Sequence, residues 1–230
     1  ITFVQDVTAT DINIAGTGTV THAGIVPETV TANITESSSG TTALVIADSV
    51  DLLAGPVITF SGTIAVDTIT IGATAKPGSG KFTGSTTATA TIHGANTAAE
   101  DSQMEMNSAT HTGGVVLTVA AAGDAAFKLS GTTAEIVGAI TATNDGTGDV
   151  VAAATTNSIF DAIGTDAAKL RAATVNASSV ATFGAAVAAD TLTINGTATL
   201  QAIANESEAI VMGANGVLFI DKTITNGQIV

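Results

Sequence analysis

One loop of the chain carries oxygen donors at a spacing that could bind a divalent cation. The stretch Asn144-Asp-Gly-Thr-Gly-Asp149 combines an amide and two carboxylates with two glycines. Hard cations such as Ca²⁺ take oxygen ligands of this kind. The stretch lacks the repeated nonapeptide of calcium-binding β-rolls and the terminal glutamate of an EF-hand. A plain β-turn is therefore the favoured interpretation, with a Ca²⁺ site at Asn144, Asp145 and Asp149 as the alternative, and no other cofactor is expected.

Asp67 and Asp190 are the candidates for a catalytic pair of carboxylates. They precede the similar segments Thr-Ile-Thr-Ile and Thr-Leu-Thr-Ile. Some β-helical hydrolases use two carboxylates that converge on one glycosidic bond, but these two occupy matching positions in distant segments. We expect each to cap backbone N–H groups at the start of a strand. Other acidic pairs could share a cation between subunits, although each is expected to be solvated: Glu100 and Asp101, Asp48 and Asp51, Glu206 and Glu208.

The three histidines, His22, His93 and His111, are isolated from one another and lie beside Thr or Gly. No metal-binding His pair or Ser/His/Asp spacing surrounds them. We expect histidines at strand edges or in loops without a catalytic role. The sequence thus predicts no enzymatic activity.

The charge balance excludes several classes of partner. The net charge is −14, with only six Lys plus Arg in 230 residues. Nucleic acids and anionic lipid surfaces are bound mainly through Lys and Arg, so neither is an expected partner. No apolar run reaches the roughly 18 residues of a membrane helix, so we expect no membrane insertion by this segment. The chain starts without the basic and apolar parts of a signal peptide, which predicts a removed export signal or a piece of a longer protein.

The apolar composition favours a thin, layered core. Hydrophobic residues make up 45 % of the chain, but aromatic residues only 3 %, with no Trp, Tyr or Cys. A spherical core would normally use large aromatic side chains to fill its centre. Short runs alternate apolar with small or polar residues, which is typical of β-strands.

A gapless internal repeat points to stacked units. Ile58–Ile71 aligns with Ala181–Ile194, and each copy has one apolar face that must lie against a similar unit. Asn195-Gly196, Asn215-Gly216 and Asn226-Gly227 are expected to form tight corners with left-handed backbone angles. These corners suit an all-β, elongated parallel β-helix of about ten coils and roughly 50 Å. The alternative is a β-sandwich or jelly-roll subunit.

Three regions are expected along the chain. Residues 1–95 and 113–230 have the texture of β repeats. Residues 96–112 hold Met104 and Met106 among acidic residues, which predicts a surface insertion or a short helix. Asn157–Ala173 also has helical propensity, although Gly164 lies within it.

The C-terminal half resembles a known family. The segments Phe160–Leu170, Thr174–Asn176, Ala181–Phe183 and Val187–Leu200 look like passenger repeats of rickettsial-type outer-membrane autotransporters. Ala134–Gly146 has the same character. The resemblance implies a secreted, β-helical bacterial protein of the cell surface, similar to surface-layer (S-layer) proteins or adhesins.

Together these features predict a non-enzymatic, extracellular structural protein. We expect it to self-assemble with other copies into a filament or surface layer through open strand edges at Ile1–Val4 and Ile224–Val230. An adhesin or carbohydrate-binding surface module is the alternative. Sugar binding usually uses exposed aromatic rings, and this chain has seven Phe but no Trp or Tyr.

Overall fold

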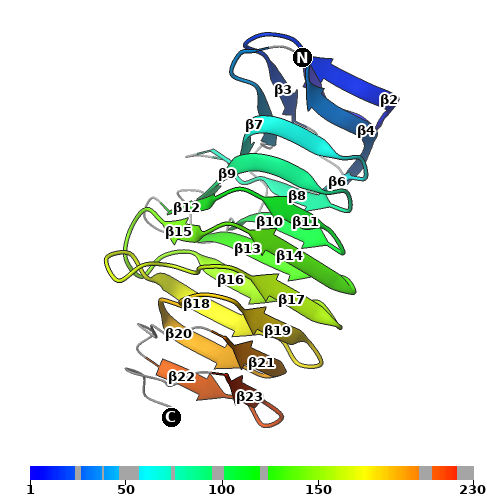
Figure 1. Cartoon of the computed structure of the whole chain (residues 1–230). Coiled ribbons are helices and arrows are strands. Elements are labelled where there is room, and N and C mark those ends of the chain that lie inside the picture. Colours follow the sequence, from blue (N-terminus) through cyan, green and yellow to red (C-terminus); the bar gives the residue numbers. More distant parts are fainter. Residues whose placement is uncertain are drawn as a thin grey trace.

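A computed structural model describes residues 1–23, 27–37, 39–46, 57–73, 76–94, 101–119, 124–201 and 209–221. All regular secondary structure in these ranges is β-strand, and every ladder between strands is parallel. The strands stack coil upon coil, from β2 at one end to β22 and β23 at the other (Figure 1). The predicted parallel β-helix is confirmed, and the sandwich or jelly-roll alternative is wrong.

The strands form three columns, each a set of strands paired side by side along the stack. Column 1 contains β1 (Thr2–Phe3), β3 (Thr19–His22), β5 (Ala43–Ile46), the second halves of β7 (Ile64–Ile71) and β9 (Thr86–Gly94), β12 (Val115–Val119) and β15 (Ile140–Ala142).

Column 2 contains the first parts of β2 (Val7–Ile14) and β4 (Glu28–Glu36), then β6 (Ile58–Phe60), β8 (Ser79–Phe82), β10 (Asp101–Asn107), β13 (Asp124–Ser130), β16 (Asp149–Ala152), β18 (Leu170–Val175), β20 (Ala189–Ile194) and β22 (Ala209–Met212). Column 3 contains the second parts of β2 and β4, the first halves of β7 and β9, β11 (Thr110–Thr112), β14 (Thr133–Val137), β17 (Asn157–Phe160), β19 (Val180–Phe183), β21 (Thr197–Leu200) and β23 (Val217–Ile220).

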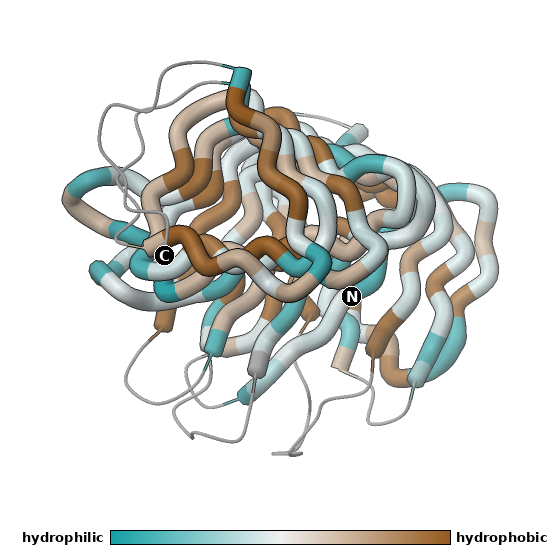
Figure 2. The backbone as a smooth tube through the Cα atoms, turned by 90° about the horizontal axis from the view of Figure 1, so that it is seen from below, coloured by the Kyte–Doolittle hydropathy of each residue, from teal (hydrophilic) through white to brown (hydrophobic). Residues whose placement is uncertain are grey.

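Alternation with a period of two places one side of every column in the core. In β9, every second residue from Thr86 to Gly94 is buried, because successive side chains of a strand point to opposite faces. Parallel pairing in register then aligns the inward residues of successive coils into ladders. One ladder of column 1 runs through Phe3, His22, Ile46, Ile71, Ile92, Leu117 and Ala142. Seen along the stack in Figure 2, the coils follow one another around this shared interior.

Phenylalanine rings fill the widest parts of the interior. Five of the seven are fully buried. Phe60 stacks on Phe82 with ring centroids 5.1 Å apart, and Phe160 stacks on Phe183 at 5.3 Å. Both pairs join neighbouring coils in register, so aromatic contacts connect the coils as well as fill them.

Gly113 sits at a corner where the backbone of the previous coil approaches closely. Its φ is +132°, and a Cβ atom there would lie 1.9 Å from the carbonyl oxygen of Ala88. We expect Gly113→Ala to lower the free energy of unfolding by about 1–3 kcal/mol, because both the backbone angle and the contact are strained. Gly114→Ala is the control, since its Cβ would meet only the Ala139 carbonyl oxygen at 3.7 Å. Denaturant titrations of the two variants measure the difference, and equal losses would contradict this role of Gly113.

The expected surface insertion or helix over 96–112 is wrong in the part that the structure describes. Residues 101–107 form β10 and residues 110–112 form β11, each paired on both sides within the stack. Met104 and Met106 are fully buried. Their spacing of two places both thioethers inward, where a flexible Met fills irregular space. The stack therefore continues through this region.

Two smaller expectations also fail. Residues 157–173 contain β17, a bridge at Ile163 and the start of β18 in place of a helix. The glycine-rich stretch 75–80, expected to be a loop, contributes Ser79 and Gly80 to β8. In both cases pairing with neighbouring coils overrides local propensity.

Column 1 fades toward the C-terminal coils. After β15 it continues only as single-residue bridges at Ile163 and Val187. The coils also shorten: Phe127 pairs with Val150, 23 residues later, whereas Leu192 pairs with Ile210, 18 residues later. In the described part, the last coils have two columns and the earlier ones three.

Candidate functional site

Asp67 fastens one coil to the previous one, as its predicted capping role requires. Its Oδ2 atom accepts hydrogen bonds from the Thr42 backbone N–H at 2.7 Å and from the Thr42 hydroxyl at 3.1 Å. The Asp67 backbone N–H donates to the same hydroxyl at 3.1 Å. These bonds satisfy backbone groups at a corner that the strand ladders leave unpaired.

Asp190, the matching residue of the sequence repeat, lies on a different side of the solenoid. Asp67 is at the corner between columns 3 and 1, whereas Asp190 belongs to β20 in column 2. The two repeat copies are thus offset by one column: 58–71 runs from column 2 to column 1, and 181–194 from column 3 to column 2. The two carboxylates do not converge, so the arrangement offers no glycosidase pair.

Two of the predicted calcium ligands contact protein groups of neighbouring coils. The Asn144 side-chain amide donates to the Val119 carbonyl oxygen at 3.2 Å. Asp145 Oδ1 accepts a hydrogen bond from the Lys169 backbone N–H at 2.9 Å. Residues 145–146 form a turn, in agreement with the favoured interpretation.

The third predicted ligand, Asp149, is held by an arginine. Asp149 Oδ1 accepts a hydrogen bond from Arg171 Nε at 3.0 Å, and its Oδ2 contacts Nη2 of the same guanidinium. The Arg171 Nη2 atom also reaches Asp124 Oδ2 at 2.6 Å. The hydrogen bond to Asp149 is the main cause that raises the pKa of Arg171.

Within the described ranges, no group of three or more His, Cys, Asp or Glu side chains could hold a metal ion. Arg171 already supplies positive charge beside Asp149, and a Ca²⁺ ion there would have to compete with it. Calcium binding at Asn144, Asp145 and Asp149 stays a prediction. The other proposed acidic pairs, 48/51, 100/101 and 206/208, have side chains outside the described residues.

A second charged cluster runs along the outside of column 2. Lys128 Nζ lies 3.2 Å from Glu105 Oε2, and Lys81 Nζ lies 3.8 Å from Glu105 Oε1. The Ser130 hydroxyl donates to Glu105 Oε1 at 2.6 Å. Burial opposes ionisation of Glu105, but these donors outweigh it and lower the pKa of the carboxyl. Basic side chains are thus used to join coils on this face.

The expectation that the histidines lie at edges or in loops is wrong for His22, which is buried near the N-terminal end. Its Nε2 atom lies 2.7 Å from Oε2 of Glu28, and both side chains are at most 4 % exposed. Burial lowers the pKa of His22 and raises the pKa of Glu28, and the charge of Asp6 adds to the rise at Glu28. Burial thus favours the neutral form of each group.

His111 is also buried, in the middle of the core. It belongs to an inward ladder of column 3 formed by Ile34, Ile64, Thr86, His111 and Ile136. The Thr86 hydroxyl lies 2.6 Å from His111 Nδ1, so the two polar residues of this aliphatic ladder satisfy each other. Burial lowers the pKa of His111 to about 4, and a backbone hydrogen bond with Gly114 offsets only part of the effect.

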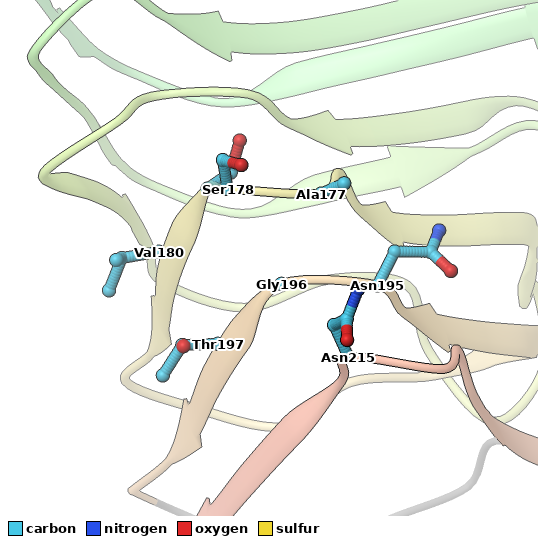
Figure 3. A pocket seen from close by; sticks show the side chains of 8 residues that line it. Ala177, Ser178, Val180, Asn195, Gly196, Thr197 and Asn215 are labelled. Atoms are coloured by element: carbon cyan, nitrogen blue, oxygen red, sulfur yellow. The ribbon is translucent and has the colours of Figure 1, made fainter.

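A shallow depression lies at the corner formed by two of the Asn-Gly pairs. It has a volume of about 310 Å³ and lies among residues 177–180, Asn195, Gly196, Thr197 and Asn215 (Figure 3). Its lining offers amide and hydroxyl groups but no aromatic ring. A carbohydrate site would normally contain such a ring, so this depression lends no support to the carbohydrate-binding alternative.

The Asn195-Gly196 pair forms a corner as predicted, but for a different reason. Gly196 is not among the residues with positive φ. A Cβ atom there would lie 2.3 Å from the Ser179 carbonyl oxygen and 2.4 Å from that of Asn176. Glycine is needed because the previous coil passes too close for a side chain.

No helical segment in the described ranges is long and apolar enough to cross a membrane. The geometry therefore assembles no catalytic or metal centre from the described side chains, and its open features are the end strands and outer faces of the solenoid. No family model, curated protein or solved structure matches the chain.

Proposed function

We propose that the protein is a non-enzymatic, extracellular structural protein that assembles with other copies into a filament or surface layer. The observation that carries this proposal is the location of the exposed large apolar side chains. Six of the eight lie on the outermost described coils: Ile1, Val4, Val211, Val217, Phe219 and Ile220. Ile1 is 73 % exposed and Phe219 58 %.

The end strands can add a further strand. Among the described ladders, β2 pairs only with β4, β22 only with β20, and β23 only with β21. Each therefore keeps one edge with backbone donors and acceptors available for another chain. β22 and β23 contain no charged residue, so they lack the charges that usually block edge-to-edge pairing.

The apolar ladders of the two ends would also continue into one another. In column 3, the last described coil presents Leu218 and Ile220 inward, after Ala198 and Leu200. The first coil presents Ile12 and Ile14 in the same column. Stacking one copy on the next would bury these aliphatic side chains, which favours association.

The composition and the resemblance support an extracellular setting. The acidic chain without cysteine, and the likeness of 134–200 to autotransporter passenger repeats, fit an exported bacterial surface protein. We therefore place the assembly on a cell surface.

The assembly is tested by electron microscopy and sedimentation of concentrated protein, in Ca²⁺ and in chelator. We expect filaments or sheets in the wild type. Val217→Lys should prevent growth, because it places a charge on the open edge of β23. Val137→Lys is the matched control, because Val137 is also in column 3 and is 46 % exposed against 43 % for Val217. A wild-type protein that stays monomeric at high concentration in both buffers would overturn the proposal.

A further inference from the structure

The outer face of column 1 carries no formal charge. Its strands, β1, β3, β5, β12, β15 and the second halves of β7 and β9, contain no Asp, Glu, Lys or Arg. The outward positions are filled mainly by Thr, Ala and Val: Thr19, Thr21, Ala43, Val45, Thr68, Thr70, Thr89, Thr91, Val116, Thr118 and Thr141, with His93 at one side. We call this surface the column-1 face.

The other two columns are charged on their outer sides. Column 2 carries the Lys81, Glu105 and Lys128 cluster, and column 3 carries Asp11 and Glu135 among its outward residues. In a chain with a net charge of −14, like-charge repulsion opposes contact through any acidic face. The column-1 face is the side on which two copies meet the least repulsion.

The column-1 face is also regular. Thr68 and Thr70 of β7 pair in register with Thr89 and Thr91 of β9, so their side chains form two short rows across neighbouring coils. These side chains are partly or largely exposed and present both methyl and hydroxyl groups. Two copies of one face share the same coil-to-coil spacing, so contacts made at one coil recur at the next.

We propose that the column-1 face is the surface through which two copies lie side by side, so that filaments pair or widen into sheets. This inference rests on the proposed function, because it names the lateral contact within that assembly. The partner is a second copy of this chain, since its column-1 face matches in spacing and lacks charge.

The size of the face makes the contact weak for single subunits. Seven strands spaced about 4.8 Å apart span about 30 Å, and the width is about 10 Å. The resulting few hundred Å² is below the roughly 800 Å² per partner of a standard stable interface. Copies already joined end to end would add their contacts, and the combined lateral association would become strong. Lateral pairing should therefore follow end-to-end growth and should increase with salt, which screens the remaining repulsion.

The test compares two double substitutions that add the same charge to different faces. Thr70→Glu with Thr91→Glu places two carboxylates on neighbouring coils of the column-1 face. Thr174→Glu with Thr193→Glu does the same on column 2, where the two threonines are also paired in register. All four threonines are partly buried, so the two variants should fold similarly, which circular dichroism and thermal melts check.

We expect electron microscopy to show paired filaments or sheets for the wild type and the column-2 variant, and single-width filaments for the column-1 variant. Thr70→Lys with Thr91→Lys should also give single-width filaments, although it makes the net charge less negative, because the charge lies on the contact face.

Each outcome separates the two proposals. Single-width filaments in the wild type, or sheets in the column-1 variants, would overturn the lateral contact and leave end-to-end assembly standing. Equal loss of pairing in the column-1 and column-2 variants would also overturn it, because the effect would then come from net charge alone. The absence of any filament in the wild type would overturn the proposed function itself.

Discussion

Replacing Phe82 with alanine is expected to lower the free energy of unfolding by about 3–5 kcal/mol, the range for a large buried aromatic ring. Phe82 is fully buried and stacks on Phe60 of the previous coil, with the ring planes 12° apart. In the next coil its register partner is Met106. The substitution would leave a cavity between three coils, and neighbouring strands held by backbone ladders on both sides can close it only in part.

Two further variants test that reason. Phe82→Leu retains most of the buried volume and should cost clearly less than Phe82→Ala. Val137→Ala removes methyl groups from a side chain that is 46 % exposed and should change stability by less than about 1 kcal/mol. Denaturant unfolding monitored by circular dichroism gives the three values. A Phe82→Ala loss no greater than that of Val137→Ala would show that the stacked ring adds little to the core.

Acidification from pH 7 to pH 4 is expected to cost the fold about 3 kcal/mol through His111 alone. The folded-state pKa of His111 is about 4, below its usual value of 6.5. Between these values the unfolded chain binds more protons than the folded one, so the free energy of unfolding rises with pH. The contribution is complete above pH 6.5 and is lost as the pH falls toward 4.

Other groups titrate in the same range and must be separated from His111. The lowered pKa of His22 acts in the same direction, and the raised pKa of Glu28 acts in the opposite one. The lowered pKa of Glu105 removes stability only at more acidic pH, as the pH falls below the usual carboxyl value of 4.5. The difference between wild type and a variant at His111 isolates the contribution of that residue.

His111→Asn is the variant of choice, because its side-chain amide can still meet the Thr86 hydroxyl but does not titrate. We expect its stability to depend less on pH between 4 and 6.5 than that of the wild type. His93→Asn is the control, since His93 is only partly buried. Identical pH profiles for wild type and His111→Asn would contradict the assignment.

The fold could be predicted from the sequence because strand alternation and parallel stacking depend on the same simple pattern. Runs such as Thr86–Gly94 alternate over nine residues, and small or β-branched residues suit a thin core. The same pattern also held the answer for 101–107, where Ser102, Met104 and Met106 alternate with Gln103 and Glu105. Local acidity suggested an insertion, but the period of two decided the structure.

The buried histidines could have been found by the same rule. His22 shares its side of β3 with Val20, and His111 lies between two outward threonines. Their partners could not be found in this way, because Glu28 and Thr86 reach them across different strands and coils. The offset of the repeat was equally hidden: a strand–corner–strand unit fits any two adjacent columns, so sequence similarity does not fix which face a copy occupies.

The loss of column 1 in the later coils gives the solenoid two unlike ends. A filament grown by stacking such subunits would be polar, and each junction would join a two-column end to a three-column end and leave a ledge. Fibre diffraction would then show the 4.8 Å strand spacing together with a long axial period set by the length of one subunit. That period would mark subunit boundaries in a rod whose backbone would otherwise look continuous.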